Sequence, residues 1–430
     1  MKSKKTTLRT NNLSRREFLK ASAVTTGAAV AWPAIVPSSV FGANAPSNRI
    51  TIGCIGLGGQ GRGNMNNFKG NPGSQVVAVC DVDADHREKA RQAAGLSPKA
   101  SYNDFRDLLA RDDVDAVSIA TPDHWHVPTS IAAVRAGKDV YCEKPLTLTI
   151  AEGRALADEV ERYGRVLQTG SQQRSSSRFR FACELVRNGR IGRVKTVRVG
   201  IPGNNKKCEP TWTAEPVPQG LDYDFWLGPA PWAPYHHQRC HYQFRFILDY
   251  SGGQVTNWGA HHLDIAQWGL GMDDSGPVEI YGQGEFPKTG LFTTATKVYF
   301  EATYANGVKL ICSTGGSSTR FEGTEGWVEV SRGSLKTSPE SLKTTTIGPN
   351  ELHLYDSRNH AQNFLDCVKS RRQPICNAEV GHRSSTICHL GNIAMLLNRR
   401  LRWDPKAEQF IGDSEANRMT WRPRRSPWLL

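Results

Sequence analysis

The sequence predicts an α/β protein of two domains, the first of which contains a parallel sheet. Between residues 49 and 145, short apolar segments alternate with helix-like segments, as in a parallel sheet covered on both faces. After residue 190, strand-like segments follow one another instead. The chain has 430 residues, 38% of them hydrophobic, and is therefore long enough to bury two cores.

The first domain is expected to begin with a strand over residues 49–56, followed by a Gly-rich turn and a helix over 62–69. The apolar period then switches repeatedly between that of a strand and that of a helix. Further strands are expected at 74–81, 114–121 and 139–145, and further helices at 84–94, 103–111 and 127–137.

The turn after the first strand reads GLGGQG and resembles a dinucleotide fingerprint. Gly56 permits the tight turn, Gly58 lets the backbone approach a pyrophosphate, and Gly61 lets the helix pack on the strand. The N-terminus of the following helix offers N–H groups to the phosphates. The residues expected to contact the cofactor here are Gly56, Gly58, Gly59, Gln60 and Gly61.

A carboxylate in the expected place selects the dinucleotide. Asp81 ends the second strand, twenty residues after Gly61. A carboxylate there accepts hydrogen bonds from both ribose hydroxyls and repels a 2′-phosphate, which favours NAD. His86 and Arg87 follow shortly afterwards and keep NADP open as an alternative.

Two further stretches make the resemblance specific. "SIATPDHWH" at 118–126 and "YCEKPLT" at 141–147, together with the turn, resemble the Gfo/Idh/MocA oxidoreductases, named after glucose–fructose oxidoreductase and inositol dehydrogenase. The similarity extends over nearly all of residues 49–425. It includes "WLGPAP" at 226–231 and "GGQVTNWGAHHLD" at 252–264.

The resemblance implies a Rossmann domain and a C-terminal α+β domain with a large, mostly antiparallel open sheet. The corresponding ranges are 1–45 for a signal peptide and linker, 46–168 for the Rossmann domain and 169–430 for the substrate and oligomerisation domain. Strand-like segments at 193–201, 276–284, 296–305, 307–314 and 326–333 agree with this second sheet, and helix-like segments come late, at 363–370 and 385–398.

The family's motifs also imply further cofactor contacts and a catalytic lysine. Contacts are expected at Thr121, Pro122, His126, Glu143 and Lys144. Oxidation of a carbinol carbon by NAD needs a group that removes the hydroxyl proton. Lys144 is the main candidate, because the family's corresponding lysine binds the reacting hydroxyl and desolvation lowers the pKa of a lysine toward neutrality.

A second candidate group lies in "NWGAHHLDIAQW". Asn257, His261 and Asp264 recur at helical spacing and share one face. Many relatives have Asp where this chain has Asn257, paired with the residue that matches His261, the expected general acid or base. Asn257 lacks that charge but can still orient the ring, so His261 either shares the proton with Lys144 or holds the substrate. His262 is its neighbour.

An aromatic stretch is the third candidate, because aromatic faces stack on sugar rings. Nine aromatic residues lie between residues 211 and 246; some are expected to bind sugar and others to form a small core under a loop. Weaker candidates for sugar contacts are Arg174, Asp222, Tyr235, Arg245 and His360, beside Asn257, His261 and His262.

The sequence favours no metal site. His236, His237, Cys240 and His241 are close together but lack a second ligand pair, so no metal is predicted. The ten cysteines form no CxxC pair, and several lie in apolar strand-like segments, which is typical of reduced core thiols.

The N-terminus resembles a twin-arginine export signal. "SRREFLK" at 14–20 precedes a mildly apolar segment that ends in Pro and Ser and is too short for a membrane span. Cleavage is expected after Ala45 or Gly42, and retention as an anchor is the alternative. Export would place the protein in the periplasm.

The charge of the chain does not indicate nucleic acid. The formal charge is +13, but the first 45 residues hold seven Lys/Arg and one Glu, which leaves about +7. No Lys/Arg block resembles a nucleic-acid tract.

Together these observations predict an exported NAD-dependent oxidoreductase that acts on a sugar, glycoside or cyclitol hydroxyl and retains its cofactor, because the periplasm has no NAD pool. One alternative is an NAD-using glycosidase that acts by transient C3 oxidation and elimination. Another is a non-catalytic sugar-binding protein. The family resemblance also implies a homo-oligomer, a dimer or a tetramer.

Overall fold

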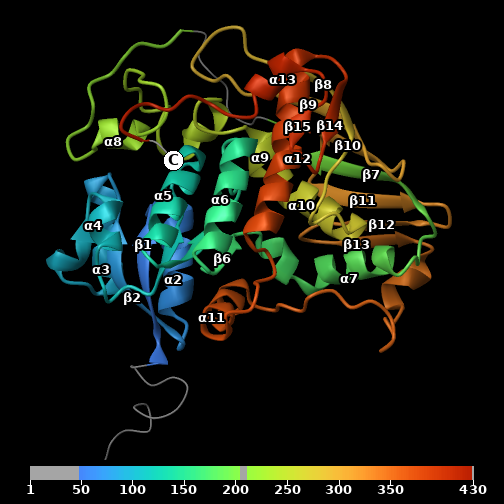
Figure 1. Cartoon of the computed structure of the whole chain (residues 1–430), viewed down its shortest axis with the longest axis horizontal. Coiled ribbons are helices and arrows are strands. Elements are labelled where there is room, and N and C mark those ends of the chain that lie inside the picture. The colour runs from blue at the N-terminus through green and yellow to red at the C-terminus, as the bar shows by residue number, and fades with distance from the viewer. Residues whose placement is uncertain (1–47, 204–210, 429–430) are drawn as a thin grey trace, which may run out of the picture. The chain divides into compact units, whose positions relative to one another are not determined.

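Six parallel strands form the first sheet of this computed structural model, in the order β3-β2-β1-β4-β5-β6. Figure 1 labels β1, β2 and β6 of this sheet. The structure describes residues 48–203 and 211–428, so the predicted signal and linker lie outside the described residues. This strand order and the parallel pairing confirm the predicted dinucleotide-binding sheet. The strands are β1 (Ile50–Ile55), β2 (Ser74–Cys80), β3 (Ser101–Tyr102), β4 (Ala116–Ile119), β5 (Asp139–Cys142) and β6 (Leu167–Thr169).

Helices connect these strands, and their ends follow local capping chemistry. The side chain of Asp83 accepts bonds from the backbone N–H groups of Asp85 and His86 and so starts α3. Helix α5 begins at Asp123, four residues before the predicted start, and Pro128 lies inside it. The helices are α2 (Gly59–Lys69), α3 (Ala84–Ala94), α4 (Phe105–Leu109), α5 (Asp123–Arg135) and α6 (Ile150–Arg162).

The second sheet has nine strands in the order β13-β12-β11-β7-β10-β9-β8-β14-β15. Every neighbouring pair is antiparallel except β7 with β10, which confirms the mostly antiparallel sheet. The strands are β7 (Val194–Ile201), β8 (Glu279–Glu285), β9 (Lys297–Thr303), β10 (Lys309–Thr314), β11 (Ser318–Gly323), β12 (Trp327–Val330), β13 (Leu335–Ser338), β14 (Leu401–Asp404) and β15 (Gln409–Phe410).

One face of the second sheet is buried beneath helices (Figure 1). Its strands alternate buried and partly exposed residues, as expected when only one face meets a core. Phe300 and Phe321 point into that core and are fully buried. The covering helices are α7 (Ser177–Arg187), α10 (Gly259–Leu270) and α12 (Ala378–Leu397).

Late segments of the chain return to the first sheet. The ring of Phe364, in α11 (His360–Ser370), lies 6.0 Å from that of Phe68 and 5.8 Å from that of Tyr141. Contacts group Arg49–Leu430 into one compact unit, so the predicted boundary at residue 168 stays a prediction.

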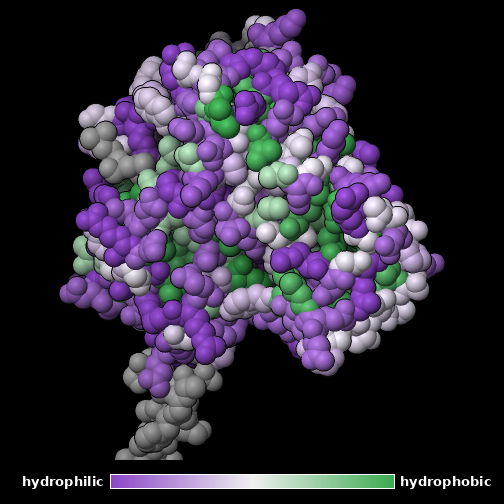
Figure 2. Space-filling view, turned by 45° about the vertical axis from the view of Figure 1, so that its right-hand side comes forward, coloured by the Kyte–Doolittle hydropathy of each residue, from purple (hydrophilic) through white to green (hydrophobic). Residues whose placement is uncertain are grey.

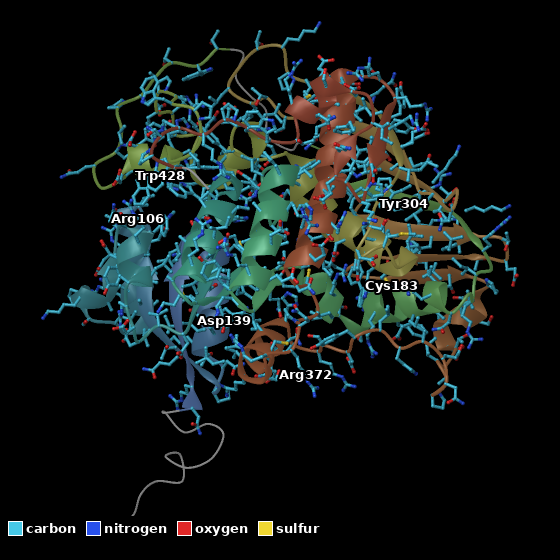
Figure 3. All side chains as sticks on the ribbon, viewed as in Figure 1. Arg106, Asp139, Cys183, Tyr304, Arg372 and Trp428 are labelled. Carbon is cyan, nitrogen blue, oxygen red and sulfur yellow. The ribbon has the colours of Figure 1, made fainter. Side chains whose placement is uncertain are left out.

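A lobe of residues Leu221–Phe246, called here the aromatic lobe, lies between β7 and α10 in the sequence. It contains α8 (Tyr223–Leu227) and η5 (His241–Phe246). Trp428 stacks on Phe225 with ring centroids 5.1 Å apart, and the guanidinium of Arg106 lies 5.2 Å from the Trp428 ring (Figure 3). The C-terminal segment therefore joins the lobe to the first domain.

The surface carries mixed hydrophilic and hydrophobic residues, and the cysteines are those of a reduced protein core. On the face shown in Figure 2, hydrophobic residues form separate patches among hydrophilic ones. Within residues 48–203 and 211–428, no helix has the length and apolar character of a membrane span. The nine cysteines in this part of the chain are all free and buried, as predicted for core thiols.

Candidate active site

The Gly-rich turn between β1 and α2 forms a cradle for a dinucleotide. Gly56 has a φ of +79°, and a Cβ at Gly61 would lie 1.8 Å from the carbonyl oxygen of Gly56, so both positions require glycine. A Cβ at Gly58 or Gly59 would meet nothing within 4 Å. The backbone is therefore open where a pyrophosphate would lie, and the residues present fit NAD.

Asp81 lies at the end of β2 beside this turn. Its Oδ2 accepts a hydrogen bond from the backbone N–H of Leu57 at 2.6 Å, and its Oδ1 accepts one from Asp83 N–H at 2.9 Å. Burial raises the pKa of Asp81, against the effect of these two bonds. The carboxylate is thereby fixed at the edge of the cavity, where it could hold the ribose of NAD.

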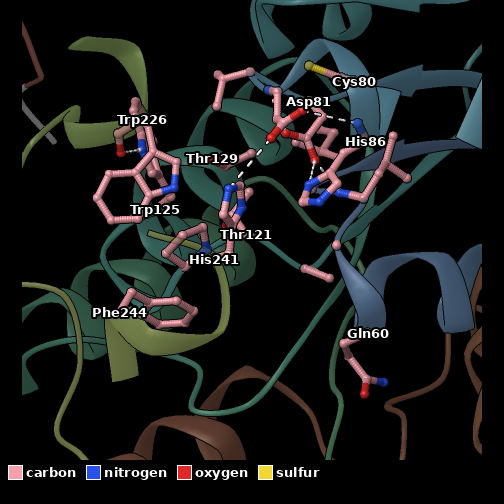
Figure 4. Close-up of a pocket in the computed structure, with 18 of the residues that line it drawn as sticks. Gln60, Cys80, Asp81, His86, Thr121, Trp125, Thr129, Trp226, His241 and Phe244 are labelled. Carbon is pink, nitrogen blue, oxygen red and sulfur yellow. Dashed lines mark hydrogen bonds and ion pairs between the residues drawn. The ribbon is translucent and has the colours of Figure 1, made fainter. Parts of the chain in front are cut away.

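A cavity of about 540 Å³ extends from the turn to the aromatic lobe. The N-terminal domain contributes residues from Ile55 to Gln60 together with Asp81, Thr121 and Pro122. Figure 4 shows Trp125, Trp226 and Phe244 on one side of this cavity and Gln60 and Asp81 on the other. Some of the aromatic residues between 211 and 246 were predicted to bind sugar and others to form a small core, and Arg245 was predicted as a sugar contact. Phe225, Trp226, Tyr242, Phe244 and Arg245 line the cavity that begins at the Gly-rich turn.

Thr121, Pro122 and His126 belong to the family motifs and have two different roles at the edge of the sheet. Thr121 and Pro122 line the cavity. His126 does not, because its ring lies between the carbonyl oxygens of Thr121 (2.9 Å from Nε2) and Pro145 (2.7 Å from Nδ1). His126 thus joins the loops after β4 and β5, and this arrangement does not support its predicted contact with the cofactor.

Glu143 holds the residues around the Gly-rich turn by hydrogen bonds to their side chains. Its Oε1 accepts hydrogen bonds from the side-chain amides of Gln60 (3.2 Å), Asn64 (2.9 Å) and Gln172 (3.0 Å). The carboxylate is 5% exposed. Glu143 therefore positions α2 and the loop after β6, and these three amides occupy it in place of a cofactor.

Lys144 follows β5 and forms the centre of the candidate site. Its Nζ donates to the backbone oxygen of Asn257 at 3.1 Å and to Oδ1 of the same residue at 3.0 Å. Burial lowers the pKa of Lys144 to about 8, and the charges of Arg245 and Arg332 act in the same direction. A lysine with this pKa exchanges a proton near neutral pH, as a general base requires.

Asn257 contacts Lys144 rather than His261. Its Nδ2 donates to Gln254 Oε1 at 3.1 Å, which fixes the amide so that Oδ1 faces Lys144. Among the residues described, no hydrogen bond joins Asn257 to His261. The expectation that Asn257 orients the histidine ring is therefore not supported: Asn257 ends α9 (Gln254–Asn257), and its amide is bonded to Lys144 and Gln254.

His261 contacts a residue that the sequence did not indicate. Nη2 of Arg332, between β12 and β13, lies 3.0 Å from His261 Nε2. Because an arginine can only donate, Nε2 accepts and the proton lies on Nδ1. Burial, Lys144 and Arg332 lower the pKa of His261 well below its usual value. Nδ1 is buried without a hydrogen-bond partner in the described structure and can donate to a substrate oxygen.

Several candidate sugar contacts lie in the interior instead. Arg174 is 1% exposed and its guanidinium is bound by Asp264 and Asp273. Tyr235 packs in the core of the aromatic lobe, and His262 bonds Ser317 Oγ at 3.0 Å.

The two weakest candidates have structural partners as well. His360 lies between Thr169 O (2.9 Å from Nε2) and Ser175 Oγ (2.7 Å from Nδ1). Asp222 caps α8 and accepts a bond from Asn103. Neither carries a free group toward Lys144 in this structure.

Within the part of the chain that the structure describes, two groups of side chains have the spacing of metal ligands. One comprises Asp83, His86 and His241, and the other Glu215, His236 and His237. In the second group, His236 Nδ1 accepts a bond from the backbone N–H of Gln238, so Nε2 carries the proton of the neutral ring. That nitrogen is unsuited to a metal, and the prediction of no metal stays a prediction.

Models of known families match most of the chain. Residues 50–171 match the oxidoreductase family model with an NAD-binding Rossmann fold, and residues 185–430 match the C-terminal alpha/beta domain of the same oxidoreductase family. Residues 12–32 match the twin-arginine translocation signal, so the chain carries this export signal.

Individual relatives differ in how much of the chain they match. A "Glycosyl hydrolase family 109 protein 2" of Shewanella sp. (strain ANA-3) is 36% identical over 171 residues, which cover 35% of this chain and 38% of that protein. The chain thus spans well under half the length of this relative. "Myo-inositol 2-dehydrogenase" of Thermotoga maritima is 24% identical over 84% of this chain and 99% of that protein.

A solved structure has the same fold. The aldose-aldose oxidoreductase of Caulobacter crescentus has a TM-score of 0.62 and 20% identity, over 82% of this chain and 99% of that one. At this identity the likeness concerns the fold alone. With the two family models covering both sheets and the turn and Lys144 in place, the chain belongs to the Gfo/Idh/MocA oxidoreductase family and carries its NAD-binding Rossmann domain.

Proposed function

We propose that this protein oxidises a hydroxyl group of a sugar, glycoside or cyclitol with an NAD that it retains through the reaction cycle. The observation that carries this proposal is the position of Lys144. It follows β5 at the edge of the dinucleotide sheet, and its pKa is lowered to about 8. A base of this strength beside a nicotinamide site suits the removal of a hydroxyl proton.

The proposed roles follow from the protonation states of the chain's own residues. Bound NAD would supply the acceptor for the hydride. Neutral Lys144 takes the hydroxyl proton, and the Asn257 oxygens stabilise the ammonium group that results. His261 donates from Nδ1 to a neighbouring substrate oxygen, because Arg332 occupies Nε2. Asp81 and the Gly-rich turn hold the nucleotide.

Export as a folded protein suits a retained cofactor. The twin-arginine signal carries folded proteins across the membrane. NAD bound in the cytoplasm would accompany the protein to the periplasm, where a second carbonyl compound or the product itself would return the hydride. We propose the periplasm as the place of action.

The first experiment measures nucleotide content. Protein produced with its signal removed is denatured, and released NAD, NADH, NADP and NADPH are quantified per chain. Gly58→Val is the test variant, since its side chain would extend into the open cradle, and Gly63→Val on the exposed side of α2 is its control. About one NAD per chain in wild type and control, and none in Gly58→Val, is expected. Wild type that holds none and binds none on reconstitution refutes the proposal.

Turnover is then tested on panels of sugars, glycosides and cyclitols. Absorbance of the bound cofactor at 340 nm should rise in a single turnover with the right hydroxyl compound. A panel that leaves the cofactor oxidised, in protein that holds about one NAD, argues for a binding role and against oxidation.

A glycosidase is the second candidate, favoured by the relatives named glycosyl hydrolase family 109 proteins. In that reaction the hydride returns to the sugar after elimination of the aglycone, so NADH does not accumulate. Aryl glycosides distinguish the two functions: release of the phenol without net NADH supports the glycosidase. Release of the phenol that persists in Gly58→Val excludes a role for NAD in it.

We also propose that the protein is a homo-oligomer that pairs through the open face of the second sheet. Partly exposed Tyr281, Tyr299 and Trp327 lie on that face, opposite the buried one. Light scattering coupled to size exclusion tests this, and a mass of one chain contradicts it.

A further inference from the structure

The aromatic lobe forms the second wall of the dinucleotide cavity. On one side the cavity is lined by the turn and by Asp81, and on the other by His241, Tyr242, Phe244 and Arg245. These four residues come from the C-terminal part of the chain, about 180 residues after the turn. A dinucleotide that lies on the turn is therefore within reach of the lobe.

The lobe is fixed to the N-terminal domain by main-chain hydrogen bonds. Asp222 N–H donates to Val82 O at 3.0 Å, and Ala84 N–H donates to Gly220 O at 2.9 Å. These bonds flank an antiparallel bridge between Asp83 and Leu221. The start of the lobe is thus bonded to the segment that follows β2, next to Asp81, the carboxylate proposed to hold the ribose.

A second attachment lies at the other end of α8. The carbonyl oxygen of Trp226 is 3.0 Å from both His124 Nε2 and Trp125 Nε1. The Trp125 ring is also packed edge-on against Trp428 at 4.7 Å. Between these attachments and the base, the lobe is held over the cavity by bonds that do not involve the nucleotide.

Arg245 brings a positive charge to the cavity. In the described ranges it forms no direct ion pair, although its charge acts on the buried carboxyl of Asp123 and opposes the rise that burial causes in the pKa of that group; its Nη1 donates to Tyr242 O at 3.0 Å. The rings of Tyr242 and Phe244 lie 4.4 Å and 4.8 Å from its guanidinium and hold it in place. Burial is the main cause of the lowered pKa of Lys144, and the charge of Arg245 acts in the same direction.

A guanidinium group binds anions, and the Gly-rich turn in the same cavity is also suited to an anion. The turn offers backbone N–H groups to a pyrophosphate, and a planar guanidinium pairs well with phosphate oxygens. Among the parts of NAD, only the diphosphate is anionic. Arg245 is therefore suited to the diphosphate rather than to the neutral sugar for which it was predicted.

His241 lies at the adenosine side. Its φ of +52° is in the left-handed region, which non-glycine residues adopt rarely and which His, Asn and Asp tolerate best. Its ring lies 5.0 Å from that of His86, and its Nε2 lies 3.7 Å from Asp83 Oδ2. The two imidazoles thus flank the position where Asp81 would hold the ribose, and both line the cavity.

We propose that the aromatic lobe is the second half of the dinucleotide site, with Arg245 paired to the diphosphate and His241 covering the adenosine. NAD then leaves only when these contacts break, and the lobe is what retains the cofactor. This inference rests on the proposed function, because it requires NAD as the ligand.

The test measures exchange of bound NAD. Holoprotein is mixed with excess NAD labelled in the adenine, and the bound label is followed by filtration at low and at high salt. The variants are Arg245→Gln, which removes the charge, and His241→Asn, which removes the ring but tolerates the left-handed backbone. Arg358→Gln, at an arginine that is 86% exposed, is the matched control. Thermal unfolding shows whether each variant is folded.

The expected result is exchange at least about tenfold faster in Arg245→Gln, since a charge-assisted contact is lost. High salt should speed exchange in the wild type and much less in this variant. His241→Asn should be severalfold faster, and Arg358→Gln unchanged.

Two results would overturn the inference, and they differ in what else they affect. If folded Arg245→Gln or His241→Asn exchanges NAD at the rate of the wild type, the lobe does not retain the cofactor, while the proposed function stands. If wild type neither holds nor binds NAD, both proposals fail. Should Arg245→Gln not fold, His241→Asn decides, because its backbone preference matches the native conformation.

Discussion

Replacing Asn257 by aspartate should raise the pKa of Lys144. The two side chains are joined by a hydrogen bond of 3.0 Å between Oδ1 and Nζ. Asp has the shape of Asn, so Asn257→Asp places a negative charge at about this distance. With an effective dielectric constant of about 20, unit charges 3 Å apart attract by about 5.5 kcal/mol, or about 4 pKa units.

The measured shift should be smaller than this value. Lys144 is partly exposed, and water reduces the attraction; carboxylates this close usually shift a partner by about 1–3 units. From about 8 in the wild type, the pKa of Lys144 should thus rise to at least about 9. Asn257→Leu is the control of opposite sign, because loss of the acceptor oxygen destabilises the ammonium form and lowers the pKa.

Competitive labelling with a limiting acylating reagent measures this pKa without any substrate. Only the neutral amine reacts, so the yield at Lys144, determined by mass spectrometry of peptides between pH 6 and 11, gives the titration curve. The reasoning is refuted if Lys144 of the wild type titrates at the usual value for lysine, or if Asn257→Asp and Asn257→Leu shift the pKa in the same direction.

Four further outcomes follow from the same geometry. Lys144→Ala should keep bound NAD but lose at least about 10²-fold in turnover, and near-normal turnover would exclude Lys144 as the base. In the wild type, oxidation should accelerate as pH rises through about 8, since only neutral Lys144 accepts a proton, and reduction should slow over the same range; a flat profile in both directions contradicts this. Arg174→Met leaves buried Asp264 without its cation and should cost about 3–5 kcal/mol in urea unfolding, with Arg358→Gln unchanged; a smaller loss than 1 kcal/mol counts against a structural ion pair. Arg332→Gln should raise the pKa of His261 toward its usual value in an NMR titration, and an unmoved imidazole would show that burial and Lys144 set it without Arg332.

The first sheet could be predicted because its signals are local. Helix α3 has the bounds predicted, 84–94, since Asp83 caps its start and Gly95 ends it in the left-handed conformation. Strand β11 was missed, because Thr319 is one of its two buried residues and Arg320 and Glu322 occupy the other face. Most residues of β11 are polar, so the sequence does not show the alternation of a strand, although every second residue faces the core.

In the candidate site, too, residues in local motifs could be predicted, and contacts between residues far apart in the sequence could not. The glycines, Asp81 and Lys144 lie in contiguous motifs whose residue types state their chemistry. Arg332 could not be found, because it lies in a polar hairpin 71 residues after His261 and only the second sheet brings them together. Arg174 was predicted to bind sugar because nothing near it in sequence indicates Asp264 and Asp273, which neutralise it.

The return of the chain to its first sheet sets the order of events during synthesis. Phe364 packs against Tyr141 and Trp428 against Trp125, so the nucleotide-binding half lacks part of its own packing until residues 364 and 428 have been synthesised. We therefore expect cofactor capture to come late, after these segments have packed. Export by the twin-arginine route, which carries folded proteins, is compatible with that order of events.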